Sequence, residues 1–160
     1  MQRHSVGLLA VAVVGGLAVA LWPDSEEDAE AEVRRLVVAM TAAAQKRQLG
    51  EVLAPVSEAF SGDAFPDKQA VKQVLAYHVL RGQWVRIFTT DLHVRKRSKD
   101  EVEVSAKFIF GRSDATELRN LAQESVLSTW GIEALAARES DGNWRFVWAR
   151  HEELDPRSLF

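Results

Sequence analysis

The chain has 160 residues, no cysteine and a formal net charge of −3 at pH 7. Without cysteine it can form no disulfide, no thiolate metal site and no cysteine nucleophile. A hydrophobic content of 47% is typical of a folded protein rather than a disordered one. A slightly acidic chain lacks the basic surface that general nucleic-acid binders use, so we expect no nucleic-acid partner.

An uncharged apolar stretch lies close to the N-terminus. Residues 6–22 read VGLLAVAVVGGLAVALW, follow the positive charge of Arg3, and precede residues 24–32, of which six are Asp or Glu. This pattern predicts either a membrane anchor or a secretory signal peptide. As a helix, about 17 residues at ~1.5 Å each reach ~25 Å, and local thinning of a ~30 Å hydrocarbon core can accommodate that length. For cleavage, Ala18 and Ala20 stand at positions −3 and −1.

Both alternatives export the rest of the chain, because the positive-inside rule keeps Arg3 in the cytoplasm. We favour the uncleaved anchor. Residues 1–23 are therefore predicted as a transmembrane anchor or signal segment, and residues 24–160 as a single domain. The expected location is a bacterial inner membrane, single-pass, with the C-terminal domain in the periplasm. Cleavage near Ala20 would instead give a secreted or periplasmic protein.

Three helices are expected after the apolar stretch. Residues 26–49 carry one apolar stripe that recurs every three or four residues, which predicts a long amphipathic helix. A short second helix is allowed within residues 50–60. Asp67 follows a proline and is suited to be the N-cap of a third helix over residues 68–81.

From residue 84 onward the apolar period changes to two, which is typical of half-buried strands. Helices followed by strands indicate an α+β fold, with three helices packed on a curved antiparallel sheet of about four strands that closes as a cone. The strands are expected over residues 84–94, 102–110, 126–139 and 143–152, with hairpin turns at residues 98–100 and 141–142. The side chains expected to face inward are Phe88, Leu92, Val102, Val104, Ala106, Phe108, Phe110, Trp130, Ile132, Ala134, Ala136, Trp144, Phe146 and Trp148.

In this order, the segments resemble the nuclear-transport-factor-2-like superfamily, which includes ketosteroid-isomerase-like and SnoaL-like proteins with a cystatin-like cone. The resemblance covers residues 29 to about 152. It rests on the long first helix, the turn SGDAF, the third helix PDKQAVKQVLAYHVL, the run of strands and the terminal DGNWRF turn and strand. It implies a pocket at the open end of the cone. It implies no particular activity, because this fold hosts enzymes, carriers and scaffolds.

The catalytic set of the isomerases of this superfamily is not matched. That set needs a carboxylate base in an apolar pocket, facing a tyrosine and a protonated acid. The sole tyrosine, Tyr77, lies in the third predicted helix, and Asp91 and Glu133 are expected to face outward. His78, near the apolar face of that helix, is the best single candidate for a pocket base. Asp91 and His93 share a strand face but lack further metal ligands, so we expect no metal and no cofactor.

The candidate ligand-binding residues are aromatic side chains expected inside the cone, together with the tyrosine and histidine of the third helix: Tyr77, His78, Phe88, Phe108, Trp130 and Trp148. With no catalytic set, the sequence predicts a non-catalytic, membrane-tethered binding or scaffold module in the extracytoplasmic space. Its partner would be the membrane through residues 6–22 and an envelope protein or a small hydrophobic ligand. The alternative is an exported small-molecule-binding protein, or an isomerase- or dehydratase-like enzyme, that uses the cone pocket.

The resemblance also implies a homodimer formed through the outer face of the sheet. A set of apolar residues expected on that face supports it: Val85, Ile87, Thr89, Ile109, Leu127 and Leu135. A separate basic cluster occupies the hairpin tip at residues 95–99. It is suited either to contacting anionic lipid headgroups or an acidic partner, or to protecting a sheet edge by charge.

Overall fold

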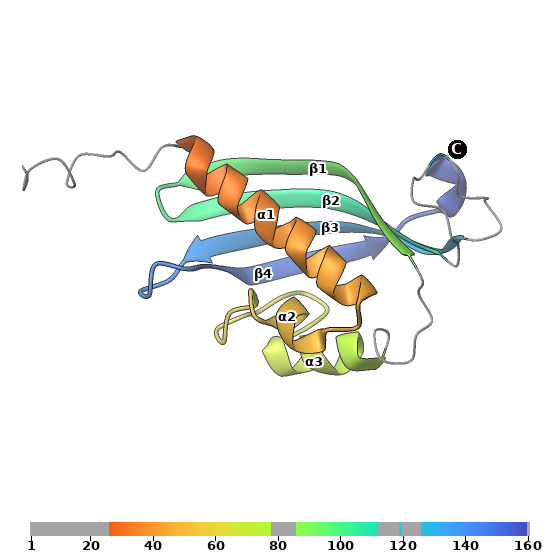
Figure 1. The fold of residues 1–160 in the computed structure, drawn as a ribbon, viewed down its shortest axis with the longest axis horizontal. Helices are drawn as coiled ribbons and strands as arrows, with labels where there is room; N and C mark the ends of the chain where they lie inside the picture. Colours follow the sequence, from red (N-terminus) through yellow and green to blue (C-terminus); the bar gives the residue numbers. More distant parts are fainter. Residues whose placement is uncertain (1–25, 78–85, 112–118, 120–125, 160) are drawn as a thin grey trace, which may run out of the picture.

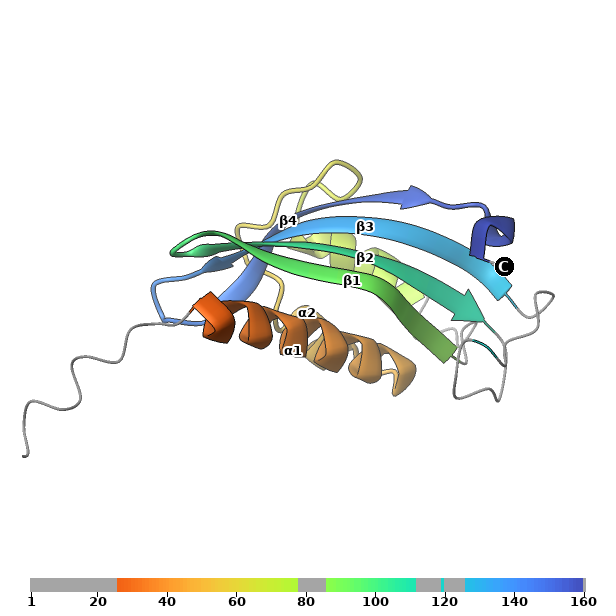
Figure 2. The same cartoon turned by 90° about the horizontal axis from the view of Figure 1, so that it is seen from above.

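The computed structural model describes residues 26–77, 86–111, 119 and 126–159. The four strands form one antiparallel sheet in the order β1-β2-β3-β4. Helix α1 crosses one face of the sheet obliquely, and the sheet curves around it (Figures 1 and 2). This confirms the predicted α+β architecture. The elements are α1 (Glu26–Gln45), α2 (Leu49–Leu53), α3 (Lys68–Leu75), β1 (Arg86–Ser98), β2 (Glu101–Gly111), β3 (Val126–Arg138), β4 (Trp144–Glu153) and the 3₁₀ helix η4 (Pro156–Leu159).

The predicted membrane segment, residues 6–22, lies outside the described residues. Within the part of the chain that is described, no helix combines the length and the apolar character needed to cross a bilayer. The helices are shorter than the sequence predicted, since α1 ends at Gln45 and α2 at Leu53. Asp67 is the N-cap of α3 as expected, because its Oδ1 accepts a hydrogen bond from Ala70 N at 2.8 Å.

Helix α1 buries its apolar stripe against the sheet. Val33 and Val37 are almost fully buried and pack with Val102, Ala136 and Phe146 from the strands in one core cluster. Side chains of α1 also bond backbone groups on the outer edge of β1, which pairs with no strand in the described part of the chain. This contact closes that edge to further strand pairing. The three hydrogen bonds run from Lys96 N to Glu30 Oε1 (2.7 Å), from Arg34 Nη1 to Leu92 O (3.2 Å) and from Ile87 N to Gln45 Oε1 (3.3 Å).

The segment that follows α2 covers the opposite edge of the sheet, along β4. Ser57 N donates to Phe146 O at 3.0 Å, and Ser61 N donates to Val147 O at 2.9 Å. Gly62 packs so closely on this edge that a Cβ there would lie 2.4 Å from Ala149 O. The chain from α2 to Gly62 is therefore fixed to the sheet by its backbone.

A β-bulge interrupts β1 between Thr90 and His93. Asp91, the extra residue, has a φ of 50°, the left-handed conformation that side-chain-bearing residues seldom adopt. Because the bulge shifts the alternation by one residue, Ile87 lines the interior and Phe88 pairs with Ile109, which lies on the other side of the sheet and is fully buried there. The prediction was therefore wrong for the first half of β1, where Phe88 was expected inside and Ile87 and Thr89 outside.

A second irregularity shifts β4 between Phe146 and Trp148. Trp144 and Phe146 are buried in the core, as predicted. Trp148 instead pairs with Leu135, which shares a register position with Glu103 on the outer face. The expectation that Trp148 faces inward was wrong for the same reason as for Phe88.

Candidate functional site

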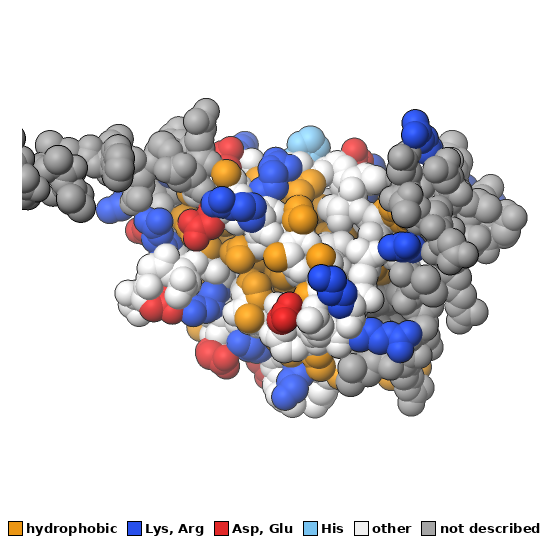
Figure 3. All heavy atoms as spheres, in the orientation of Figure 1, with side chains coloured by type: hydrophobic (Ala, Val, Ile, Leu, Met, Phe, Trp, Pro, Cys, Tyr) orange, Lys and Arg blue, Asp and Glu red, His pale blue; other side chains and the backbone are white. Residues whose placement is uncertain are grey.

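An apolar cavity of about 270 Å³ lies between the inner face of the sheet and the helices. Its walls come from α1, α2, α3 and the segment between α2 and α3, and its floor comes from all four strands. Viewed from the α1 side, hydrophobic side chains gather in the middle of this face, with charged side chains around them (Figure 3). The lining includes Met40 and Ala44 of α1, Phe60, Val71 of α3, Phe108 of β2 and Phe146 of β4.

The cavity offers almost no polar chemistry. Thr41 is the one polar side chain among the described lining residues, and its Oγ1 donates to Val37 O of the same helix at 3.0 Å. None of the described lining side chains is ionisable. The described walls can therefore bind an apolar surface but cannot move a proton or pair with a charge.

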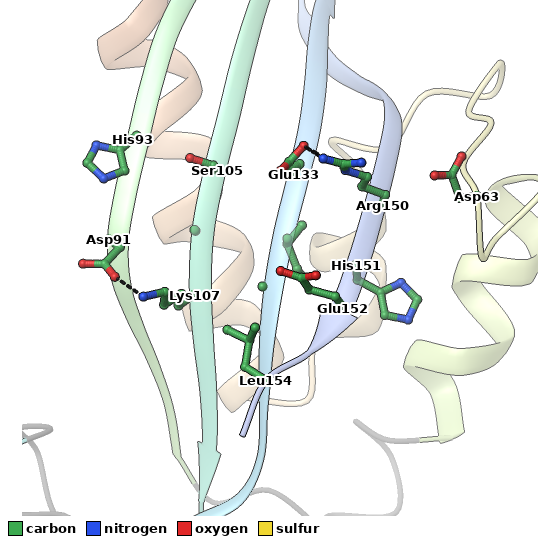
Figure 4. A pocket seen from close by; sticks show the side chains of 13 residues that line it. Asp63, Asp91, His93, Ser105, Lys107, Glu133, Arg150, His151, Glu152 and Leu154 are labelled. Carbon is green, nitrogen blue, oxygen red and sulfur yellow. Dashed lines mark hydrogen bonds and ion pairs between the residues drawn. The ribbon is translucent and has the colours of Figure 1, made fainter. Parts of the chain in front are cut away.

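A larger hollow of about 590 Å³ lies on the opposite face of the sheet, away from α1 (Figure 4). Its charged side chains are largely occupied with one another. Lys107 Nζ lies 2.8 Å from Asp91 Oδ2, and Arg150 Nη2 lies 2.7 Å from Glu133 Oε2. Hydrogen bonds from these cations hold the pKa values of both carboxyl groups below their usual range. All four side chains are about half exposed, so this hollow has the character of a solvated sheet face.

Two further sequence hypotheses concern charged residues. Among the described residues, no three or more His, Asp or Glu side chains gather in a way that could hold a metal ion, and Asp91 pairs with Lys107. At the basic hairpin tip, Arg95 and Arg97 lie 2.6 Å and 3.8 Å from Glu103. The hydrogen bond from Arg95 lowers the pKa of Glu103. The same hairpin thus neutralises part of its own positive charge.

The five described residues of the predicted ligand-binding set do not lie together at the cavity. Phe108 lines the cavity. Trp130 pairs with Phe108 in register, but its ring packs against His151 with the ring centres 5.0 Å apart. Tyr77 follows α3 and is about half exposed. Phe88 and Trp148 lie on the outer face because of the bulges, and His78 lies outside the described residues.

Sequence reasoning missed the helical half of the cavity wall. Met40 and Ala44 belong to the apolar stripe of α1, which indicates burial but not a cavity. Phe65 also lines the cavity, and its ring stacks on His151 with 5.0 Å between ring centres and 9° between ring planes. A single aromatic residue in a turn carries no periodic signal, so the sequence gives no means of placing it.

At the level of sequence, no family model matches the chain and a search of curated proteins found no match. The fold, in contrast, is similar to many solved structures. One is a nuclear-transport-factor-2-like protein of unknown function from Pseudomonas putida, with a TM-score of 0.63 and 16% identity over 79% of this chain and 87% of that one.

Two other similar structures are described by a relationship to an enzyme or by an enzyme activity. A ketosteroid-isomerase-like protein from Erwinia carotovora atroseptica has a TM-score of 0.59 and 14% identity over 79% of this chain and 97% of that one. The hexachlorocyclohexane dehydrochlorinase LinA-type3 from Novosphingobium barchaimii has a TM-score of 0.60 and 14% identity over 79% and 87%. At these identities the likeness shows the fold alone. The chain has the nuclear-transport-factor-2-like, cystatin-like fold that its sequence resembles.

Proposed function

We propose that this chain is a membrane-tethered, extracytoplasmic binding protein that holds a small, uncharged, apolar molecule in the cavity between its sheet and its helices. The observation that carries this proposal is the lining of that cavity, in which Thr41 is the one polar side chain among the described residues and its hydroxyl is already bonded to Val37 O. An apolar cavity of ~150 Å³ holds one benzene ring. A volume of about 270 Å³ therefore suits a ligand of about two fused rings.

The same lining favours binding over catalysis. An isomerase or dehydratase of this fold needs a proton-transfer group within hydrogen-bond reach of the reacting atom. The described walls supply no such group. The fold itself does not decide the matter, since the similar structures include a dehydrochlorinase. The enzymatic alternative would need a titratable side chain from outside the described residues, with His78 the candidate that the sequence offers.

The tether in this proposal is the apolar stretch over residues 6–22. Three residues separate it from the start of α1 at Glu26. Four peptide steps span at most about 14 Å, so the tether would keep the domain close to the bilayer, into which apolar ligands partition. Cell fractionation with a C-terminal tag tests this part. We expect the full-length chain in the membrane fraction, and a soluble product that begins near Leu21 would contradict it.

The binding proposal is tested with the full chain in lipid nanodiscs and the neutral probe 1-naphthylamine, whose two fused rings match the volume of the cavity. Binding is followed by energy transfer from the tryptophans of the domain. Two variants of α1 form a matched pair, because both replace an alanine of the same helix with phenylalanine. Ala44 lines the cavity, whereas Ala39 is exposed on the other side of the helix. Probe that dissolves in the lipid contributes equally to both variants and cancels in the comparison.

We expect Ala44→Phe to weaken probe binding at least tenfold, because the new ring occupies the space that the probe needs. Ala39→Phe should bind within twofold of the unchanged protein. Equal binding by the two variants would refute the cavity as the ligand site. It would favour the scaffold role, in which the domain contacts an envelope protein through its surface.

A further inference from the structure

We propose that α3 is a lid over the apolar cavity, which swings outward to admit the ligand and closes over it. This inference rests on the proposed binding function and adds how the site opens. Helix α3 supplies Val71, Val74 and Leu75 to the cavity lining. Yet none of its eight residues is buried, and Val74 is 37% exposed. The helix therefore covers the cavity without being enclosed by the rest of the domain.

The neighbouring helix α2 shows the contrast. Val52 and Leu53 of α2 also lie at or beside the cavity, but both are buried. The chain after α2 is bonded to the edge of β4 by its backbone as far as Ser61, and Gly62 is pressed against Ala149 O. These contacts make α2 and the following segment part of the rigid wall.

Phe65, whose ring stacks on His151 of β4, is the last residue before α3 that is held against the sheet. Within the described residues, no recorded hydrogen bond or ion pair joins Lys68–Leu75 to the sheet. Lys68 Nζ lies 2.7 Å from Glu58 Oε1, but the Glu58 side chain is 90% exposed, and ion pairs of this kind contribute little to stability. Val71 and Leu75 pack on the small cluster around Phe60, a contact that is apolar and non-directional. The chain between Phe65 and Asp67 is thus the natural hinge.

Helix α3 is also built to move as one body. Asp67 caps it from within the moving segment, so the first turn keeps its hydrogen bond when the helix swings away. Its apolar side is the cavity lining, while Gln69, Lys72 and Gln73 are exposed to solvent. An apolar ligand gives the apolar side of α3 a surface to close on, and the hydrophobic effect then favours the closed position.

Hydrogen exchange of the full chain in nanodiscs tests the lid directly. Without the probe, the amides of α3 should exchange faster than those of α1 and α2. Saturating 1-naphthylamine should slow exchange in α3 at least fivefold and leave α1 unchanged. The Ala44→Phe variant should show no slowing of exchange at the same probe concentration. Probe binding that leaves α3 exchange unchanged would overturn the lid and leave the binding proposal intact. If the probe binds neither the unchanged protein nor its variants, both proposals fall.

A kinetic variant separates a lid from a passive wall. Asp67→Ala removes the cap of α3 without touching the cavity lining. It should raise the dissociation rate of the probe about fivefold, which corresponds to ~1 kcal/mol, the usual value of an N-cap. Asp100→Ala, an exposed aspartate in the β1–β2 turn, is the matched control and should leave the rate unchanged. Equal rates in the two variants, with α3 still helical by its exchange pattern, would show that α3 does not gate the cavity.

Discussion

Deleting Asp91 should leave the domain folded, although the residue lies inside the 13-residue strand β1. In a regular strand, losing one residue turns every following side chain to the opposite face. Asp91 is the extra residue of a bulge, so the shortened strand can keep Ile87 facing the cavity and Val94 facing the core with no bulge at all. The deletion also removes the left-handed backbone at Asp91, which costs about 1 kcal/mol or more.

Deleting His93 is the matched control, since it shortens the same strand two residues away. To keep both Ile87 and Val94 inward, this variant must turn Leu92 outward and the Asp91 carboxylate inward. Losing the contact of Leu92 with the core costs roughly 1–2 kcal/mol, and an unpaired carboxylate facing the core adds to that.

Thermal unfolding, followed by tryptophan fluorescence of the full-length protein, measures the difference between the two deletions. At about 3 °C per kcal/mol, the Asp91 deletion should melt at least ~3–6 °C above the His93 deletion. Equal melting temperatures, or an unfolded Asp91 deletion beside a folded His93 deletion, would refute the assignment of the bulge.

Three further predictions follow from particular contacts. Gly62→Ala should destabilise the domain by about 1–3 kcal/mol in thermal unfolding, because the new Cβ meets Ala149 O at 2.4 Å and backbone must move. Ser57→Ala should also destabilise it at pH 7. The Ser57 hydroxyl donates to Glu139 at 2.5 Å and lowers the pKa of that carboxyl, so the part of the difference that this bond contributes should be present above pH 4.5 and be lost as the pH falls through the lowered pKa. Ser57 Oγ also accepts from Ala59 N at 3.0 Å, so a part that does not depend on pH should remain. We propose a homodimer through the outer face of the sheet, where Leu135 lies. Sedimentation in detergent should show that Leu135→Arg is monomeric, while Val38→Arg on the exposed side of α1 stays dimeric. A monomeric unchanged protein would contradict this interface.

The order of elements was predictable because it depends on local patterns. The stripe of α1, the cap at Asp67 and the turn signal at Asp141-Gly142 each act within a few residues. The loop is one residue longer than predicted, because Glu139 N donates to Asn143 O and Gly142 N to Glu139 O, and Gly142 alone has the positive φ, 82°, that ends such a three-residue loop. The inward faces of β2 and β3 were also predicted correctly, since those strands alternate regularly over the predicted positions. Ile87 was wrongly expected on the outer face that would form a dimer, because its side chain lines the interior.

The faces of β1 and β4 were not predictable in the same way. A bulge adds one residue to a pattern whose period is two, and the residues on either side of Asp91 still alternate. Asp91 alone does not mark the position, because aspartate, although enriched in the left-handed region, adopts it in only a small fraction of cases. The pairing register of β1 with β2 decides which face each side chain of β1 takes, and that register is a long-range property.

The cavity itself follows from these two bulges. Regular alternation would place Phe88 and Trp148 inside the cone, where they were expected as ligand-binding residues. The bulges turn both large rings to the outer face and leave the smaller side chains of Ile87 and Ala149 beside the cavity. A close-packed interior has few voids larger than a water molecule, so a cavity of about 270 Å³ needs a reason to exist. The outward rotation of two aromatic rings supplies that reason. It also explains why Phe88 and Trp148, which the sequence predicts as pocket lining, lie outside the cavity.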